Sequence, residues 1–368
     1  MLSLHTALLT TSLLLLLHLL LLPHLCRNLP YCSYHQPPST PPSATSLEEA
    51  AEEELRQIAR SGSPEGGGSW VAVVVLTRSR RGASYLGRSL AALHRQVVGE
   101  EEQPRVLLCS GEPGERVGST WPFLTLRPNT TSTQPPGNRR AKEDLASCVA
   151  LADQALAPEV THVLVLEDDV EVMEGLFPTL AAWMTYHRGT LAAPWLDIKL
   201  YASPRLRGWA WDPAPLVELL ATSALLAGLV EGLVVVGGRT TIRRARVVVV
   251  WAGCLAALLV AGRQHVVQWR RLHPQLYLRK EAPSAGTQAV LYPRTALASA
   301  AAFLLERVEE DTPRDLTLGQ YRRAARLAGH LLEPNLARHI GRTSAFDAAH
   351  AAERDQGDTR EFLADGPL

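Results

Sequence analysis

The chain has 368 residues, and its 37 Lys and Arg residues balance its 37 Asp and Glu residues, so the formal net charge is zero. This balance excludes the strongly basic domain typical of nucleic-acid-binding proteins, and we expect no nucleic acid among the partners. The length suffices for one large domain or two modest ones. The chain is 46% hydrophobic, but the apolar residues concentrate in two regions, which indicates membrane segments.

The first apolar region, residues 7–25, contains no formally charged side chain. About 20 apolar residues span a bilayer as a helix. A cleaved signal peptide is the alternative, but the run is longer than a usual signal core and no small-x-small cleavage site follows it. We therefore predict a cytosolic tip at residues 1–6, a transmembrane anchor at 7–25 and a lumenal stem at 26–69. The stem contains a charged helical stretch for which Ser46 is the expected N-cap.

The globular part opens at residue 70 with a β-branched run that ends at Thr77 and predicts a buried parallel strand. Further strands are expected at 105–109 and 162–166, and helices at 85–98 and 142–156. Strands that alternate with helices predict an α/β domain with a mostly parallel sheet. Asn129 begins an Asn-Thr-Thr sequon, which is an acceptor for glycosylation only in the lumen.

The third of these strands ends in three acids, Glu167, Asp168 and Asp169, which we call the acidic motif. Ligands of open α/β sheets bind outside the carboxyl ends of the strands. Adjacent carboxylates repel one another, and a divalent cation with oxygen ligands would offset that repulsion. The motif therefore predicts a metal site that can also hold a nucleotide diphosphate. A solvated acidic turn is the alternative.

The second apolar region divides into runs at 216–236 and 247–267, which are joined by a loop at 237–246 with four arginines. A short basic loop between two spans should stay cytosolic. The runs then form a transmembrane hairpin that interrupts a lumenal catalytic domain, with its first half at 70–215, its second half at 268–345 and a tail at 346–368. Two buried core helices are the alternative, and Glu218 and Glu231 favour it because charge at membrane depth is costly.

Two further groups near the C-terminus are candidates for chemistry. Asp315 begins an expected helix, where it is either a helix-start carboxylate or a general base for an acceptor hydroxyl. His339, in a Glu-Pro-Asn-Leu-Ala-Arg-His-Ile-Gly segment, is either structural or a metal ligand. Among the five cysteines, Cys109 and Cys148 lie in polar regions and either pair in an oxidising lumen or remain free buried thiols.

The motifs in order resemble those of one known family. They are WVAVVVLT, a Lys-x-Asp-x(3)-Cys segment at 142–148, VLVLEDDV, LDIKLY, the hairpin, RRLHPQLY, TQAVLYP, PRDLTL and EPNLARHIG. The chain resembles the post-GPI-attachment N-acetylgalactosamine (GalNAc) transferases over about residues 70–345. The hairpin inserted within the catalytic domain is the specific feature, because acidic motifs and His-Ile-Gly segments occur in several GT-A glycosyltransferase families.

The resemblance implies a GT-A fold interrupted by the hairpin, in a multi-pass Golgi membrane enzyme with a lumenal catalytic domain. It implies UDP-GalNAc as donor, Mn²⁺ as cofactor, the lipid bilayer as a partner, and the first mannose of the glycan on GPI-anchored proteins as acceptor. It also favours a Cys109–Cys148 disulfide and Asp315 as the base. The metal ligands implied are Glu167, Asp168, Asp169 and His339. The donor-binding residues implied are Thr77, Ser79, Lys142, Asp144, Thr287 and Gln288.

The chain departs from the family pattern at two of these positions. No acid stands two residues after Thr77, where Ser79 is found, and Gln288 replaces an expected proline. Two other functions therefore stay open: a lumenal UDP-sugar transferase that adds N-acetylglucosamine to N-glycans, and a non-catalytic membrane protein on a transferase fold. The inserted hairpin favours the GPI transferase over both.

Overall fold

The computed structural model describes residues 44–61, 68–77, 85–98, 103–110, 123–127, 137–203, 213–236 and 244–341. The chain forms two compact units. One includes residues 203–269, and the other, which we call the catalytic unit, combines Pro42–Ala202 with Arg270–Asp358. The anchor at 7–25, Ser79, Asn129 and the tail at 346–368 lie outside the described residues, so these predictions remain predictions.

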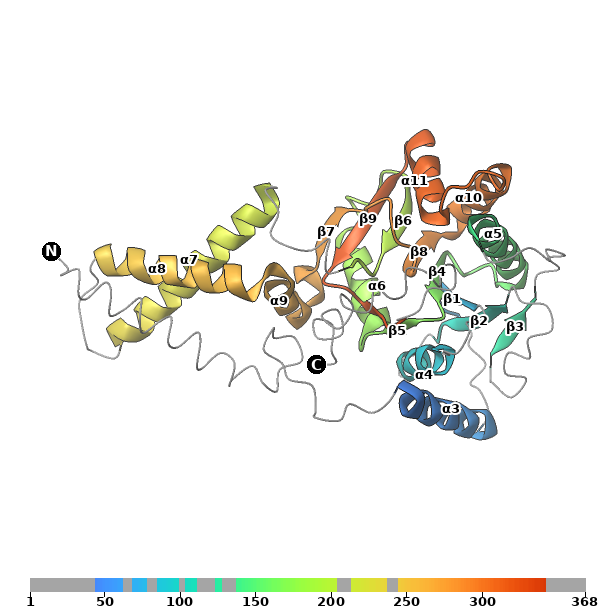
Figure 1. The fold of residues 1–368 in the computed structure, drawn as a ribbon, viewed down its shortest axis with the longest axis horizontal. Helices are drawn as coiled ribbons and strands as arrows, with labels where there is room; N and C mark the ends of the chain where they lie inside the picture. Colours follow the sequence, from blue (N-terminus) through green and yellow to red (C-terminus); the bar gives the residue numbers. More distant parts are fainter. Residues whose placement is uncertain are drawn as a thin grey trace. The chain divides into compact units, whose positions relative to one another are not determined.

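The catalytic unit contains an eight-stranded sheet in the order β3-β2-β1-β4-β8-β6-β9-β7 (Figure 1). The strands β7 and β8 run antiparallel to their neighbours and the others run parallel to one another. This arrangement confirms the prediction of an α/β domain with a mostly parallel sheet. The strands are β1 (Val71–Thr77), β2 (Arg105–Ser110), β3 (Leu124–Leu126), β4 (His162–Glu167), β6 (Trp195–Lys199), β7 (Leu278–Glu281), β8 (Ala289–Pro293) and β9 (Ala328–Glu333).

Both faces of the central strands are buried, which explains their continuous apolar sequences. In β1, Val73 packs into the core on one face of the sheet and Val74 packs into the core on the other. One face is covered by α3 (Ala44–Ser61), α4 (Leu86–Val97) and α6 (Leu176–Tyr186). The other is covered by α5 (Asn138–Ala155), α10 (Arg294–Glu306) and α11 (Arg314–Ala324).

Helix α3 lies within the predicted stem but packs on the catalytic unit. It begins at Ala44, so the prediction of Ser46 as the N-cap is wrong, and Ser46 lies in the first turn. Leu55 is fully buried in the core shared with α4. The backbone N–H of Gly87, in α4, donates to the Glu48 carboxylate at 2.7 Å. The apolar face of α3 therefore continues the layer of helices on this side of the sheet.

A disulfide joins Cys109, in β2, to Cys148, in α5, with 5.9 Å between their Cα atoms. Both residues are buried in the core on the α5 face of the sheet. The structure thus contains the bridge that the family resemblance implied. It ties the second strand to the helix that precedes the acidic motif.

A small second sheet lies after the acidic motif, where β5 (Val170–Val172) pairs antiparallel with β10 (Ala337–His339). His339 is opposite Val170 in this register. The backbone N–H of Ile340 donates to the Asp169 carbonyl at 2.8 Å. The pairing therefore brings the C-terminal His-Ile-Gly segment against the end of the acidic motif.

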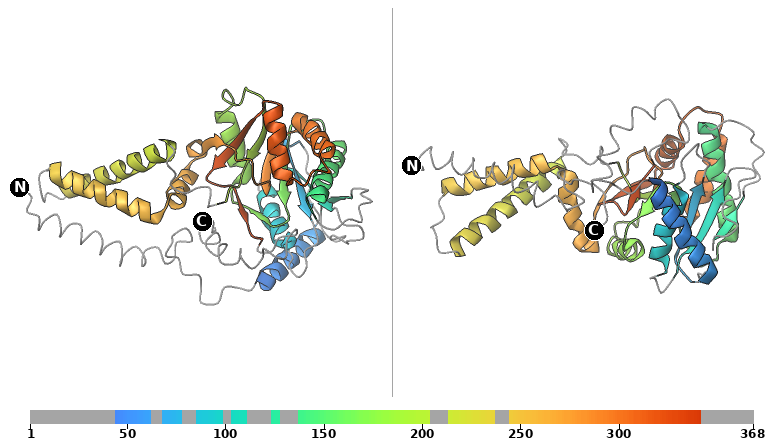
Figure 2. Two further views of the ribbon diagram at one scale, coloured as in Figure 1. Left: turned by 45° about the horizontal axis from the view of Figure 1, so that its top comes forward. Right: turned by 60° about the horizontal axis from the view of Figure 1, so that its bottom comes forward.

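The other unit contains α7 (Pro213–Val236) and α8 (Arg244–Ala261), which pair antiparallel (Figure 2). Residues Pro213–Leu233 of α7 form the one helix, within the described part of the chain, that is long and apolar enough to cross a membrane. The second span, predicted at 247–267, lies partly in helix α8, and its placement in a membrane remains a prediction. Helix α8 ends at Ala261, because Gly262 adopts a left-handed φ of 88° that terminates the helix. The short helices α9 (Arg263–Val266), η3 (Val267–Leu272) and η4 (Pro274–Leu276) follow.

Polar side chains of α7 are paired with side chains of α8 and of the first residue of α9. Glu231 accepts from Arg246 at 2.6 Å, and Glu218 accepts from Arg263 at 2.7 Å. Between these ion pairs, the Trp251 indole N–H donates to the Ser223 hydroxyl at 2.9 Å. The two acids that argued against a membrane hairpin are thus matched by arginines, which lowers the cost of placing them in an apolar layer.

Candidate functional site

The carboxyl ends of β1 and β4 lie at the point where the strand order of the sheet reverses. The chain leaves β1 through α4 toward β2, and it returns through α5 to β4 on the other side of β1. Ligands of open α/β sheets bind where the strand order reverses in this way. Thr77 ends β1, and its hydroxyl donates to the Asp168 carboxylate at 3.3 Å. The predicted donor-binding threonine and the middle acid of the motif therefore meet at this edge.

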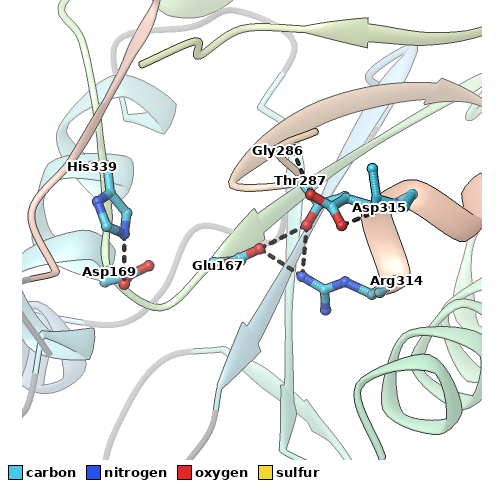
Figure 3. A network of polar contacts seen from close by, with 8 residues as sticks. Glu167, Asp169, Gly286, Thr287, Arg314, Asp315 and His339 are labelled. Atoms are coloured by element: carbon cyan, nitrogen blue, oxygen red, sulfur yellow. Dashed lines mark hydrogen bonds and ion pairs between the residues drawn. The ribbon is translucent and has the colours of Figure 1, made fainter. Parts of the chain in front are cut away.

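Glu167, the last residue of β4, points toward the start of α11 (Figure 3). Its Oε1 accepts from the Thr287 hydroxyl at 2.9 Å and from Arg314 Nη2 at 2.6 Å. Arg314 Nη2 also donates to the Thr287 hydroxyl at 2.8 Å. Arg314 was not predicted as a site residue. A cation at the first residue of a helix is unfavourable because of the helix dipole, so an arginine there indicates a nearby anionic partner. This was the signal in the sequence that could have identified Arg314.

Asp169 points to the other side of β4, where it meets His339 (Figure 3). The distance between His339 Nε2 and Asp169 Oδ2 is 3.0 Å. Asp169 is 2% exposed, while the His339 side chain is 24% exposed. The buried carboxylate thus lies beside a partly exposed imidazole. The structure brings together two of the predicted ligands, which lie 170 residues apart in the sequence.

The acidic motif does not form a single cluster of metal ligands by itself. Within the described ranges, no group of three or more His, Cys, Asp or Glu side chains lies close enough to hold a metal ion. The pair Asp169 and His339 nevertheless offers a carboxylate oxygen and an imidazole nitrogen, which suit Mn²⁺. Divalent cations in phosphate-binding sites often take only one or two protein ligands and complete their shell with substrate phosphates. The residues present fit such a site.

Residues 282–288 form a loop, between β7 and β8, that carries Thr287 to the site. Asp315 Oδ2 accepts from the backbone N–H of Gly286 at 2.8 Å, and its Oδ1 accepts from the N–H of Leu316 at 2.8 Å. Gly286 has a left-handed φ of 90°. The predicted base therefore also anchors this loop at its most constrained residue.

Lys199, at the end of β6, holds the same loop from the sheet side. Its Nζ donates to the carbonyl of Ala285 at 2.7 Å and to that of Ser284 at 3.3 Å. Burial lowers the pKa of Lys199 to about 8, while the negative charge of Asp197 acts in the opposite direction and raises it. Sequence reasoning missed Lys199, although a lysine within a buried strand is a rare residue that calls for partners.

Three other predicted donor-binding residues are placed as follows. Lys142 is fully buried, and its Nζ donates to the carbonyls of Arg307 and Glu310, both at 2.7 Å. Its contacts thus hold the turn after α10. Asp144 is buried in the same helix. Gln288 meets the acidic motif through its backbone, since its carbonyl accepts from the N–H of Glu167 at 2.9 Å.

The chain matches the model of a known family. A family model described as GPI-N-acetylgalactosamine transferase PGAP4 matches residues 70–338, which is more than half of the chain. The matched region includes Thr77, the acidic motif, Thr287, Arg314 and Asp315, and it runs through both helices of the inserted unit. It ends one residue before His339.

Proposed function

Because the chain belongs to the GPI-N-acetylgalactosamine transferase PGAP4 family, it is a glycosyltransferase of GPI, and we propose UDP-GalNAc as its donor and the first mannose of the GPI glycan as its acceptor. GPI-anchored proteins are the acceptors that this function implies. In the proposed reaction, GalNAc is transferred to a mannose hydroxyl and UDP is released. The acceptor O–C bond forms as the bond between the anomeric carbon and the phosphate oxygen breaks.

The proposed donor site is the edge formed by the carboxyl ends of β1 and β4. The observation that carries this proposal is the meeting of the acidic motif with residues from four separate parts of the chain: Thr77, Thr287, Arg314 and His339. Such convergence places hydrogen-bond donors and acceptors where a nucleotide can bridge them. The mostly parallel sheet with helices on both faces supports a GT-A fold for this unit.

Asp169 and His339 are the residues that we propose to hold Mn²⁺, together with the donor diphosphate. When bound, a divalent cation there would neutralise the charge of the UDP leaving group. Glu167 and Asp168 have other contacts, with Arg314 and Thr77 respectively. We therefore propose that these two acids position the ends of β1, β4 and α11 around the donor.

Asp315 is the proposed general base, which accepts the proton of the mannose hydroxyl during transfer. Its carboxylate lies at the start of α11, next to Arg314 and to the loop that carries Thr287. Each of its oxygens accepts one backbone N–H and has a second lone pair for the acceptor hydroxyl. These two hydrogen bonds fix the direction in which the carboxylate points.

We propose that the enzyme is a multi-pass protein of the Golgi membrane with a lumenal catalytic unit. The Cys109–Cys148 disulfide supports an oxidising compartment. The apolar helix α7 and its arginine-matched acids support insertion of the α7–α8 pair into the bilayer. A GPI acceptor is held at the membrane by its lipid, so a membrane-bound enzyme gains local concentration and orientation.

The test is a transfer assay with purified full-length protein in detergent. UDP-GalNAc, UDP-GlcNAc and UDP-Gal are each offered with a GPI-anchored acceptor, with and without Mn²⁺, and the glycan mass is measured. We expect a gain of one N-acetylhexosamine from UDP-GalNAc that depends on Mn²⁺. Equal transfer in the presence of a metal chelator would refute the metal proposal, and transfer only from UDP-GlcNAc would refute the donor.

A further inference from the structure

The catalytic unit is interrupted between Ala202 and Arg270, where the chain leaves to form the inserted unit and then returns. Both sides of this interruption contact one residue, Asn335. The Asn335 Oδ1 accepts from the backbone N–H of Ala202 at 3.1 Å, and its Nδ2 donates to the Ala202 carbonyl at 3.0 Å. On the return side, Arg271 Nη2 donates to the Asn335 backbone carbonyl at 3.0 Å. We call these three hydrogen bonds the clasp.

The two side-chain bonds of the clasp, both to Ala202, are specific to asparagine, whereas Arg271 bonds to a backbone carbonyl that any residue offers. Asn335 is 1% exposed and Ala202 is 4% exposed, so the backbone groups of Ala202 need partners within the protein. A primary amide offers one acceptor and one donor side by side, which match the N–H and C=O of a single residue. An aspartate would keep the acceptor but lose the donor, and an alanine would lose both.

A short and continuous set of contacts leads from the clasp to His339. The next residue, Leu336, donates its N–H to the Leu200 carbonyl and accepts from the Met173 N–H, each at 2.9 Å. Strand β10 follows at once and pairs with β5. At the end of β10, His339 meets Asp169 at 3.0 Å.

We infer that Asn335 is a positioning residue that closes the interrupted catalytic unit and sets β10, and with it His339, in register with Asp169. Asn335 directly follows Pro334 and lies four residues before His339, so its contacts fix the chain just before β10 begins. A loss of the clasp frees the loop that begins β10. The part of the inference that concerns metal binding rests on the function proposed above.

The experiment compares full-length wild type, Asn335→Ala, Asn335→Asp and a control, Asn138→Ala. Asn138 also donates its amide to a partner, Asp311, at 2.8 Å, but at the surface of α5. Hydrogen–deuterium exchange is measured at Leu336 and Ile340, whose amides bond to Leu200 and Asp169 rather than to Asn335. We expect Asn335→Ala to raise exchange at both amides by about tenfold or more, since two buried hydrogen bonds are lost.

The second measurement is Mn²⁺ binding in the presence of UDP. It is monitored through the electron paramagnetic resonance signal of free Mn²⁺, which decreases as the ion binds. We expect Asn335→Ala to weaken this binding by about tenfold, as changes in groups that orient metal ligands do. Asn138→Ala should match the wild type in both measurements. If the wild type binds no Mn²⁺ with UDP, the proposed metal site fails, while the exchange data still test the clasp.

Unchanged exchange at Leu336 and Ile340 in Asn335→Ala overturns the clasp. Faster exchange with unaltered Mn²⁺ binding overturns its role in positioning His339. Should Asn335→Ala fail to fold, Asn335→Asp serves as the test at alkaline pH, where an ionised carboxylate keeps the bond to the Ala202 N–H and loses the bond to its carbonyl. Amide exchange at Leu336 and Ile340 in Asn335→Asp should then be faster than in the wild type and slower than in a fully released loop. Exchange equal to that of the wild type would show that the second side-chain bond, to the Ala202 carbonyl, is not needed.

Discussion

The two ends of the acidic motif have different surroundings. Glu167 accepts from Arg314, a permanent cation, and from Thr287, so its charge is matched within the protein. Asp169 meets His339, whose imidazole can release Asp169 and itself bind a metal. Three consecutive acids thus have two kinds of surroundings, which fit the two roles that we propose: fixing the architecture of the edge, and binding an exchangeable ligand. A run of carboxylates in a sequence is therefore not in itself a set of metal ligands.

Replacement of Asp169 tests the exchangeable end and should have the largest effect. We expect Asp169→Ala to reduce transfer by about a thousandfold or more, since the proposed metal would lose its carboxylate. Transfer is measured with the purified protein, alongside its melting temperature. The control is Asp153→Ala, which removes an acid that pairs with Arg294 at the surface. Near-normal transfer by a folded Asp169→Ala would remove the metal assignment.

Asp315→Asn separates chemistry from loop anchoring. The asparagine oxygen can still accept the Gly286 N–H, but the side chain cannot accept a proton from the acceptor. We expect kcat to fall by about a hundredfold or more, as is usual for loss of a general base, with UDP affinity little changed. Asp311→Asn, a surface change before the same helix, should leave both values intact. Loss of UDP binding would instead assign Asp315 to the loop alone.

Replacement of Arg314 or Glu167 tests the other end of the acidic motif, where Glu167 is paired within the protein. Arg314→Met leaves the partly buried Glu167 without its cation, and we expect transfer to fall by about tenfold, mainly through a higher KM for the donor. Glu167→Gln should have a smaller effect, because the amide oxygen still accepts from Thr287. The double variant is the sharper measurement, since coupled residues give non-additive losses. Additive losses would show that the pair does not act as a unit.

Lys142 is a buried cation whose contacts join α5 to the turn after α10. Lys142→Met leaves the carbonyls of Arg307 and Glu310 without their donor, and we expect a loss of about 1–3 kcal/mol in the free energy of unfolding. Thermal unfolding measures the loss, and transfer per folded molecule should stay near the wild-type value. A raised KM for the donor with unaltered stability would favour the original prediction that Lys142 binds donor.

Much of the fold could be predicted from local pattern. The β-branched run before Thr77 and the apolar run before Glu167 gave strands because each fills both faces of a sheet. Hydropathy alone could not place the end of α8, because the apolar composition continues past Gly262 while the backbone turns there. Ser46 was misplaced because Ala44 and Thr45 are already helical, whereas an N-cap residue lies outside the helical backbone.

The site was predictable in part. The acidic motif, Thr287, Asp315 and His339 were named as candidates, but the division of the motif between two sets of partners depends on Arg314, which follows Glu167 by 147 residues. Sequence spacing carries no information about which side of β4 each acid faces after the strand has ended. The roles of Lys199 and Asn335 were missed because both act through backbone carbonyls or amides, which leave no pattern in side-chain chemistry.

The clasp has a practical consequence for protein engineering. Since Asn335 touches both sides of the interruption, the points where the chain departs and returns are stitched together within the catalytic unit. Residues 203–270 can then be exchanged for a flexible Gly/Ser linker of roughly eight residues, which reaches about 15 Å on average. Combined with a cleavable signal peptide in place of residues 1–41, this exchange should give a secreted catalytic unit that is purified without detergent.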